Sequence, residues 1–156
     1  MINTNNIVWQ DLSLINTAPK NIQQWLDDKT SLTAKLKQQF EDFSVHVLSQ
    51  QQAQPHSHEI ESISISDQYT IREVELLGNG VAVVFARSVI PLTNDTKEIL
   101  SIGSKPLGEI LFNDASIQRG QMQITQTDNL WGRRSTFTIG NTKLLVSEFF
   151  TKDLYA

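Results

Sequence analysis

Three arginines and one glutamate fall at strand positions where the alternate neighbouring residues are apolar. They are Arg72 in TIREVELL, Arg87 in VVFARSV, and Arg133 and Glu148 in the last two expected strands. A buried cation without a partner is costly, and the arginine guanidinium binds carboxylates through two parallel hydrogen bonds. Three arginines facing one acid leave positive charge over, which predicts a small, anionic and partly apolar ligand. The open alternative is a set of structural ion pairs, because buried charges are normally paired within the protein.

The first expected hairpin decides whether two of these arginines meet. Residues 69–77 and 81–90 alternate apolar and polar side chains around Asn79-Gly80, a dipeptide typical of type I′ turns. A two-residue turn there places Arg72 directly opposite Arg87, on the apolar face that also carries Val74. Two cations in that position repel each other, so we expect an anion to lie between them.

The second expected hairpin pairs a cation with an acid. Residues 133–139 and 142–150 flank Gly140-Asn141, a glycine-first dipeptide that suits a type II′ turn. In that register Arg133 faces Glu148, and we expect Arg133 to orient and balance the carboxylate. The adjacent Arg134 points the other way, and we expect it at the surface. A one-residue slip in either hairpin would send its charges to the opposite face.

Helices and further strands must position these residues. Helical spacing of apolar residues predicts helices at 17–28, from Ser31 to about Phe40, at 96–102 and at 106–112, with prolines near two of the starts. Alternation predicts strands from Phe43 and over 116–126, and the Gln- and His-rich stretch 50–59 is expected to be the most mobile loop. Strands outnumber helices and hairpins dominate, so the sequence predicts an α+β fold with an antiparallel sheet.

Composition limits the class of protein. A chain of 156 residues with 39% hydrophobic and 19% charged residues is typical of one soluble globular domain, expected to span 1–156. The formal net charge of -4 does not favour nucleic acid as a partner. No apolar run is long enough to cross a membrane and the N-terminus has no signal-peptide pattern, so we expect a cytoplasmic protein that is not membrane-inserted.

Motifs for metals and cofactors are weak. The chain has no cysteine, and His56 and His58 lie in a polar stretch without partnering acids, so we expect solvated histidines and no metal site. The turn at 78–80 lacks the third glycine and the following helix of a dinucleotide site. We expect no cofactor, and a monomer.

With these residues in view, the chain resembles the chorismate pyruvate-lyase family. The resemblance extends over nearly the whole chain, from QQWLDDKTSLTAKLKQQF through IREVELLGNG, ARSVIP and GSKPLGEILF to LWGRRS and LLVSEFF. It implies a single domain with an antiparallel sheet of about six strands flanked by helices, and a cofactor-free site closed by helical flaps. It also implies the substrate chorismate, whose two carboxylates match the ligand type that the arginines predict.

The resemblance further implies roles for individual residues. Arg72 and the backbone amide of Leu107 would hold the ring carboxylate, and Glu148 and the backbone of Leu32 would meet the 4-hydroxyl end. Arg87 would meet the enolpyruvyl carboxylate and stabilise charge on the departing group. Leu32 stands where the family commonly has Met, which preserves a backbone contact but can alter how tightly the flap closes.

The implied reaction is an elimination that yields pyruvate and 4-hydroxybenzoate, the first step of ubiquinone biosynthesis. The site would hold the reactive conformer, stabilise charge through Arg87 and assist proton movement through Glu148. Whether Glu148 acts as acid, base or hydrogen-bond partner stays open. Two other functions stay open as well: a non-catalytic effector-binding domain of the same fold, and a chorismate-using enzyme with another product such as 3-hydroxybenzoate.

Overall fold

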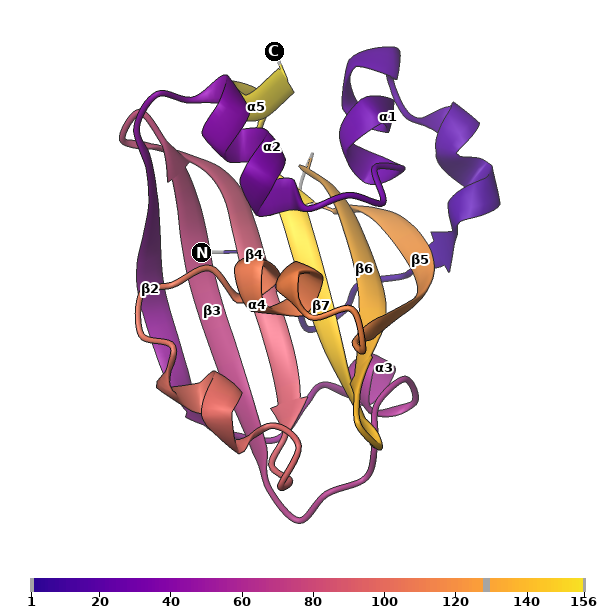
Figure 1. The fold of residues 1–156 in the computed structure, drawn as a ribbon. Coiled ribbons are helices and arrows are strands. Elements are labelled where there is room, and N and C mark those ends of the chain that lie inside the picture. The colour runs from indigo at the N-terminus through magenta and orange to yellow at the C-terminus, as the bar shows by residue number, and fades with distance from the viewer. Residues whose placement is uncertain (1, 128–129, 156) are drawn as a thin grey trace.

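The chain folds around one antiparallel sheet. The computed structural model describes residues 2–127 and 130–155, and within them seven strands follow the order β1-β5-β6-β7-β4-β3-β2 (Figure 1). The strands are β1 (Gln10–Asp11), β2 (Phe43–Gln52), β3 (Tyr69–Gly78), β4 (Val81–Pro91), β5 (Gln118–Thr127), β6 (Leu130–Ile139) and β7 (Thr142–Phe150). The predicted α+β class is confirmed. The seventh strand, which was not expected, is the two-residue β1 at the sheet edge.

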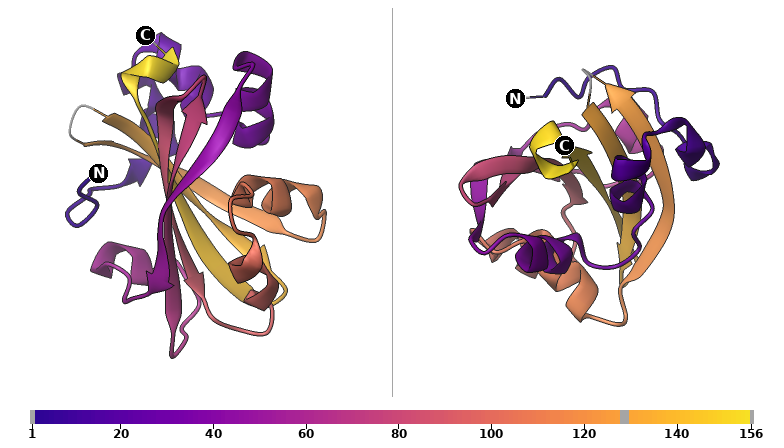
Figure 2. Two further views of the ribbon diagram at one scale, coloured as in Figure 1. Left: turned by 90° about the vertical axis from the view of Figure 1, so that its left-hand side faces the viewer. Right: turned by 90° about the horizontal axis from the view of Figure 1, so that it is seen from above.

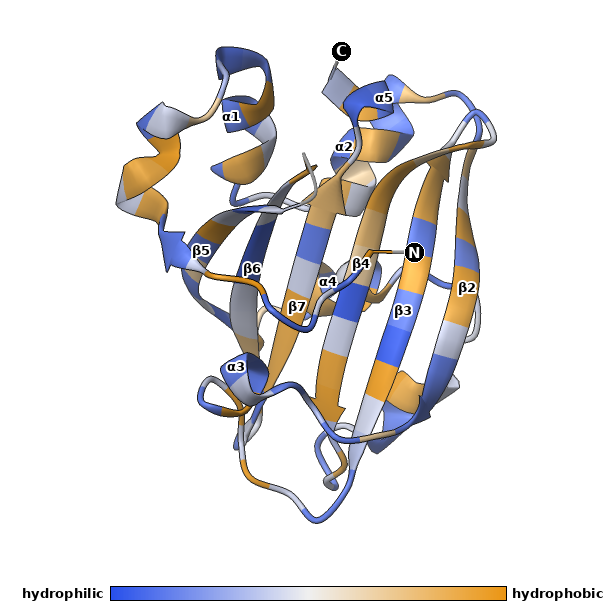
Figure 3. Ribbon diagram, turned by 180° about the vertical axis from the view of Figure 1, so that it is seen from behind, coloured by the Kyte–Doolittle hydropathy of each residue, from blue (hydrophilic) through white to orange (hydrophobic). Residues whose placement is uncertain are grey.

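Helices cover the two faces of the sheet unequally. The helical segments are η1 (Leu12–Thr17), α1 (Lys20–Leu26), α2 (Leu32–Gln39), α3 (Ser57–Ile60), η2 (Lys97–Ser101), α4 (Leu107–Asn113) and α5 (Lys152–Tyr155). Figures 1 and 2 show α2, η2 and α4 on one face. Seen from behind, the N-terminal segment and α3 lie against the other face (Figure 3). In the described part of the chain, no helix is long and apolar enough to cross a membrane.

The predicted helices form for local reasons, and three of them, α1, α2 and η2, are shorter than expected. Ser31 caps α2, because its side-chain oxygen accepts a hydrogen bond from the backbone N–H of Ala34 at 3.2 Å. Pro19 and Pro106 directly precede α1 and α4 and suit these starts. The segment expected as a helix at 96–102 is a short 3₁₀ helix, η2. These short helices depend on packing against the sheet for most of their stability.

The turn of the first hairpin has the predicted type, but the predicted register of its two strands was wrong. Asn79 and Gly80 both have positive φ, 50° and 80°, as a type I′ turn requires. Next to the turn, however, Leu77 pairs with Ala82 and the register then shifts by one, which leaves Val83 as an extra residue in β4. Such a β-bulge changes the face of every residue beyond it.

The bulge separates the two arginines that were expected to meet. Arg72 pairs with Ser88, and Arg87 pairs with Glu73. Because side chains alternate along a strand, Arg72 and Arg87 therefore point to opposite faces of the sheet. The expected pair of facing cations does not exist.

The second hairpin has the predicted register. Arg133 pairs with Glu148, and Gly140 alone in the turn has a positive φ, 58°, which fits a type II′ turn. Both charged side chains lie on the sheet face that α1 and α2 cover, where Phe150 also packs.

A second bulge lies in β5. Arg119 pairs with Phe137 and Met122 pairs with Ser135, so residues 120–121 together face one residue of β6. The extra residue brings Arg119 onto the same face as Met122, which strict alternation would not do.

The stretch expected as a mobile loop is ordered by contacts. It continues β2 and then forms α3, whose Glu59 is 1% exposed. Nε2 of His56 lies 2.9 Å from the hydroxyl of Thr4, and Nε2 of His58 lies 2.8 Å from the Thr4 carbonyl oxygen. The expectation of solvated histidines was therefore wrong, because both rings fix the N-terminal segment.

Candidate active site

An enclosed cavity lies between the sheet and the helices α2 and α4. Its floor is formed by residues of the strands β2 to β7, and its roof by the start of α2 and by α4 with the preceding Pro106. The cavity volume is about 40 Å³, which is smaller than a ring compound. The lining is mostly apolar, and its charged members are Arg72, Arg119, Arg133 and Glu148.

Arg72, on β3, lines the cavity, and its charged guanidinium has neutral hydrogen-bond partners. It is 3% exposed, and its guanidinium donates to the side chain of Gln50 at 2.9 Å and to the carbonyl oxygens of Gly103 and Lys105 at 2.9 and 3.1 Å. Burial lowers the pKa of Arg72. None of the salt bridges among the described residues involves Arg72. Its positive charge is therefore available to a bound anion.

Glu148 and Arg133 face each other across β6 and β7. Nε of Arg133 donates to Oε1 of Glu148 at 2.9 Å, and its Nη1 donates to the carbonyl oxygens of Trp25 and Asp28 at 2.9 and 2.6 Å. Arg133 is 1% exposed and its guanidinium lies 5.6 Å from the Phe150 ring. One oxygen of the Glu148 carboxylate is thus held in place, which leaves the other for a ligand.

Arg72 and Glu148 lie at opposite sides of the cavity floor. Arg72 pairs with Ser88 on one side of β4, and Glu148 pairs with Ala86 on the other side. Two interstrand steps separate their strands by about 10 Å.

The first residues of two helices lie in the roof of the cavity. Leu32 and Leu107 are the first residues of α2 and α4, and both line the cavity. The N–H groups of a first helical turn have no partner within the helix. An ion pair between Lys37 and Glu109 joins α2 to α4 on the outside. The four residues predicted to hold the ring and its hydroxyl, Leu32, Arg72, Leu107 and Glu148, therefore come together here.

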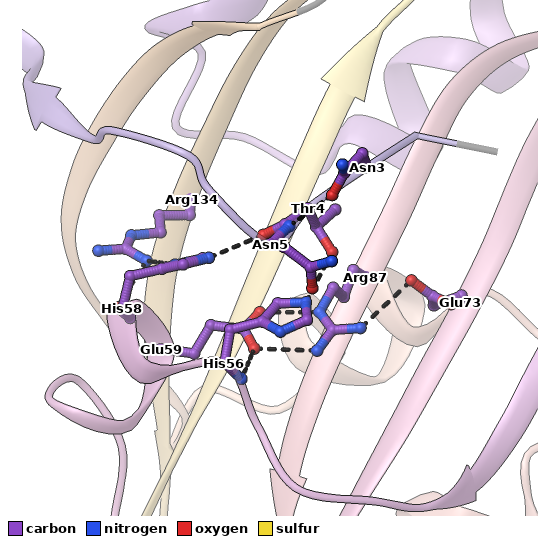
Figure 4. A network of polar contacts seen from close by, with 9 residues as sticks. All are labelled: Asn3, Thr4, Asn5, His56, His58, Glu59, Glu73, Arg87 and Arg134. Carbon is purple, nitrogen blue, oxygen red and sulfur yellow. Dashed lines mark hydrogen bonds and ion pairs between the residues drawn. The ribbon is translucent and has the colours of Figure 1, made fainter.

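Arg87, the fifth predicted site residue, lies on the far face of the sheet (Figure 4). Its Nε and Nη2 donate to the two carboxylate oxygens of Glu59 at 2.8 and 2.9 Å, and Nη1 donates to Glu73 at 3.3 Å. Burial alone would raise the pKa of Glu59, but the hydrogen bonds and charge of Arg87 outweigh it and hold that pKa below its ordinary value. Arg87 is a buried ion-pair member here, and its predicted contact with substrate stays a prediction that this geometry does not favour.

Arg134 also differs from expectation. It points away from the cavity as predicted, but it is 7% exposed, not a surface residue. Its guanidinium stacks 4.7 Å from the Trp9 ring and donates to Gln123 at 2.8 Å and to the carbonyl oxygen of His58 at 3.1 Å. The N-terminal segment and α3 cover it (Figure 4).

Arg119 is a cavity residue that the sequence analysis missed. It lines the cavity from β5, and its Nε donates to the hydroxyl of Ser135 at 2.9 Å. Burial, together with the nearby charge of Arg133, lowers the pKa of Arg119 to about 10. The alternation of β5 gives no signal for this position, because the bulge at 120–121 reverses the face.

The cavity combines a charge surplus with an apolar lining. Three guanidinium groups and one carboxylate line it, which favours a small dianion with an apolar body. The described residues contain no group of three or more His, Cys, Asp or Glu side chains placed to hold a metal ion. The chemistry available to these side chains is binding, charge stabilisation and proton transfer.

Solved structures show where else this fold occurs. A possible transcriptional regulator from Bacillus subtilis superposes with a TM-score of 0.51 at 9% identity, over 73% of this chain and 60% of that one. A GntR-family transcriptional regulator from Enterococcus faecalis gives the same TM-score at 14% identity, over 72% of this chain and 96% of that one. At such identities the likeness concerns the fold alone.

Sequence comparison gives the family. A probable chorismate pyruvate-lyase from Psychromonas ingrahamii is 36% identical, over 86% of this chain and 84% of the relative. Another from Pseudoalteromonas atlantica is 30% identical, over 93% of this chain and 86% of the relative. The family model for chorismate lyase matches residues 3–156. With this match over almost its full length, the chain belongs to the chorismate lyase family.

Proposed function

We propose that this protein is a chorismate pyruvate-lyase that converts chorismate to 4-hydroxybenzoate and pyruvate as the first step of ubiquinone biosynthesis. It works as a cytoplasmic monomer without a cofactor. The observation that carries the proposal is the buried guanidinium of Arg72, which lies across the cavity floor from Glu148 and has only neutral hydrogen-bond partners among the described residues. Membership of the chorismate lyase family supports the same reaction.

The proposed binding mode uses both ends of the cavity. Arg72 and the backbone N–H of Leu107 bind the ring carboxylate, which supplies the counter-charge that Arg72 lacks. Glu148 accepts a hydrogen bond from the 4-hydroxyl group, and the backbone of Leu32 lies beside it. Val74 and Phe137 supply apolar contacts to the ring. This arrangement fixes the ring at both ends and so holds one conformer for reaction.

The reaction breaks one C–O bond and one C–H bond. The ether bond between ring carbon 3 and the enolpyruvyl oxygen breaks, and the electron pair leaves with that oxygen. A proton leaves ring carbon 4, which bears the hydroxyl, so the ring becomes aromatic. The departing enolpyruvate takes up a proton at carbon and becomes pyruvate. Cationic groups in the cavity stabilise the developing negative charge, and Glu148 assists the proton transfer.

The test uses purified protein, chorismate and a metal chelator, with no nucleotide present. We expect chorismate to disappear as pyruvate and 4-hydroxybenzoate form in equal amounts, measured by absorbance and chromatography. Arg72→Gln is the matched variant, and it should lose both turnover and affinity for 4-hydroxybenzoate. Tight binding of chorismate without turnover would instead indicate an effector-binding domain. A 3-hydroxybenzoate product would indicate a different chorismate-using enzyme.

A further inference from the structure

Arg119 stands at the boundary between the closed cavity and the outside. Together with Phe112 it lines the cavity, and the same two residues line an outer groove bordered by Leu12 and Lys29. The bulge at 120–121 holds Arg119 on the cavity face of β5. A ligand in the cavity and a substituent that extends toward the groove would both pass this guanidinium.

The guanidinium of Arg119 has unused hydrogen-bonding capacity. Its Nε donates to the hydroxyl of Ser135, and its Cζ lies 5.5 and 5.3 Å from the ring centroids of Phe112 and Phe137. Its Nη1 is buried, and among the described residues it has no hydrogen-bond partner. Buried donors are nearly always satisfied in folded proteins, so an orphan donor in a cavity wall points to a ligand.

The positive charge of Arg119 also lacks a counter-charge of its own among the described residues. Arg119 forms no salt bridge within residues 2–127 and 130–155. Glu148 is the carboxylate nearest to it in the cavity lining, but the Nε of Arg133 already binds one of its oxygens. Two cations therefore share one acid at this end of the cavity. A second anionic group must arrive with the ligand if this end is to be neutral.

We infer that Arg119 binds the carboxylate of the enolpyruvyl group, the second carboxylate of the substrate. The inference rests on the proposed function, because it uses the ring orientation given there. The enolpyruvyl ether is attached to ring carbon 3, next to the hydroxyl-bearing carbon that Glu148 contacts, so its carboxylate extends toward the Glu148 end. Nη1 of Arg119 donates to this carboxylate and stabilises the negative charge that grows on the departing enolpyruvate.

This assignment gives the two carboxylates separate receptors. Arg72 binds the ring carboxylate, which both substrate and product carry. Arg119 binds the enolpyruvyl carboxylate, which the product 4-hydroxybenzoate has lost. The two arginines therefore differ in a measurable way, because only the Arg72 contact contributes to product binding.

The test compares turnover with product binding in Arg119→Gln. We expect kcat/KM for chorismate to fall about 10²-fold, while the Kd for 4-hydroxybenzoate measured by calorimetry changes less than about twofold. Arg119→Lys, which restores the charge without the fork geometry, should recover part of the lost turnover. Lys29→Gln is the matched control, since it removes a positive charge from the outer groove alone, and it should leave both quantities unchanged.

Two outcomes would overturn the inference. Either wild-type turnover in Arg119→Gln, or an equal loss of product affinity and turnover in a variant that keeps its thermal unfolding midpoint, would show that Arg119 does not act on the enolpyruvyl carboxylate. Failure of the proposed function looks different, because the wild-type protein itself would then neither turn over chorismate nor bind 4-hydroxybenzoate.

Discussion

At the scale of single residues, Arg133 contacts two parts of the molecule at once. It donates to the carboxylate of Glu148, and it also donates to the carbonyl oxygens of Trp25, in α1, and of Asp28, just after α1. It is almost fully buried, so its effect on catalysis runs through the residues that it positions. Arg133 is therefore a positioning residue in the proposed reaction, and Glu148 is the residue that touches substrate.

A double-mutant cycle tests this relation. We expect Arg133→Ala to lower kcat for chorismate because the Glu148 carboxylate loses the donor that fixes it. If Arg133 acts only through Glu148, then adding Arg133→Ala to Glu148→Gln should lower kcat little further, which is strong non-additivity. Steady-state kinetics of the two single variants and the double variant measure the coupling. Additive losses, or normal turnover in Arg133→Ala, would contradict the positioning role.

Sequence patterns predict the positions of some of these residues correctly and of others incorrectly. Arg133 and Glu148 are found because their strands alternate without interruption from a two-residue turn. Arg72 is found because an arginine inside an apolar alternation is unusual. Arg87 is placed on the wrong face, and Arg119 is not found, since each lies beyond or beside an extra residue that no pattern reveals.

At the scale of elements, the two β-bulges decide which arginines reach the cavity. The bulge at Val83 turns Arg87 away from it, and the bulge at 120–121 turns Arg119 into it. The cavity is lined by three arginines and one acid, which is the number predicted from the sequence. The third arginine, however, is Arg119 and not Arg87. A β-bulge changes the face to which a side chain points, and it disrupts the local hydrogen bonding between the two strands.

Gly120 allows a direct test of the second bulge. A Cβ at this position would overlap the hydroxyl of Thr136. We expect Gly120→Ala to lower the free energy of unfolding by about 1–3 kcal/mol and to reduce kcat/KM, because the bulge shifts and moves Arg119. Urea unfolding and steady-state kinetics provide the two measurements.

The rescue variant for Gly120→Ala removes the clash. The Cβ atoms of residues 120 and 136 would then lie 3.6 Å apart, which is ordinary van der Waals contact. Gly120→Ala combined with Thr136→Ala should therefore recover most of both losses. If the double variant is no better than Gly120→Ala, the bulge geometry is not what positions Arg119.

At the scale of the whole molecule, the two faces of the sheet perform different tasks. One face holds the cavity under α2 and α4, and the other binds the N-terminal segment and α3 through a polar network (Figures 3 and 4). Arg87 and Glu59 form the centre of that network, with side-chain exposures of 7% and 1%. Removal of one partner of a buried ion pair leaves an uncompensated charge.

Glu59→Gln tests the structural role of the far-face pair. We expect the free energy of unfolding at pH 7 to fall by about 3 kcal/mol, while kcat/KM for chorismate measured well below the unfolding midpoint stays near the wild-type value. Glu61→Gln, a change at an exposed neighbour, should have no effect on stability. A large loss of kcat/KM in folded Glu59→Gln would instead place Arg87 in the reaction.

The stability that the Arg87–Glu59 pair contributes depends on pH, because the pKa of Glu59 is lowered in the folded protein. Between the pKa of Glu59 in the folded protein and its pKa in the unfolded chain, the unfolded chain binds more protons. The free energy of unfolding therefore rises with pH in this range. The contribution is fully present above the ordinary pKa of a glutamate and is lost as the pH falls through the lowered value. The difference in unfolding free energy between wild type and Glu59→Gln should therefore shrink as the solution is acidified.

The sequence by itself determined the α+β class, six of the strands, both turn types and the pairing of Arg133 with Glu148, because turn chemistry and alternation act over a few neighbouring residues. Only the tertiary structure decided which face Arg87 and Arg119 occupy, and that residues 50–59 are ordered by contacts with Thr4 and Arg87. The physical reason is that a single extra residue in a strand reverses every later side chain, and whether it is accommodated depends on the packing of both faces at once.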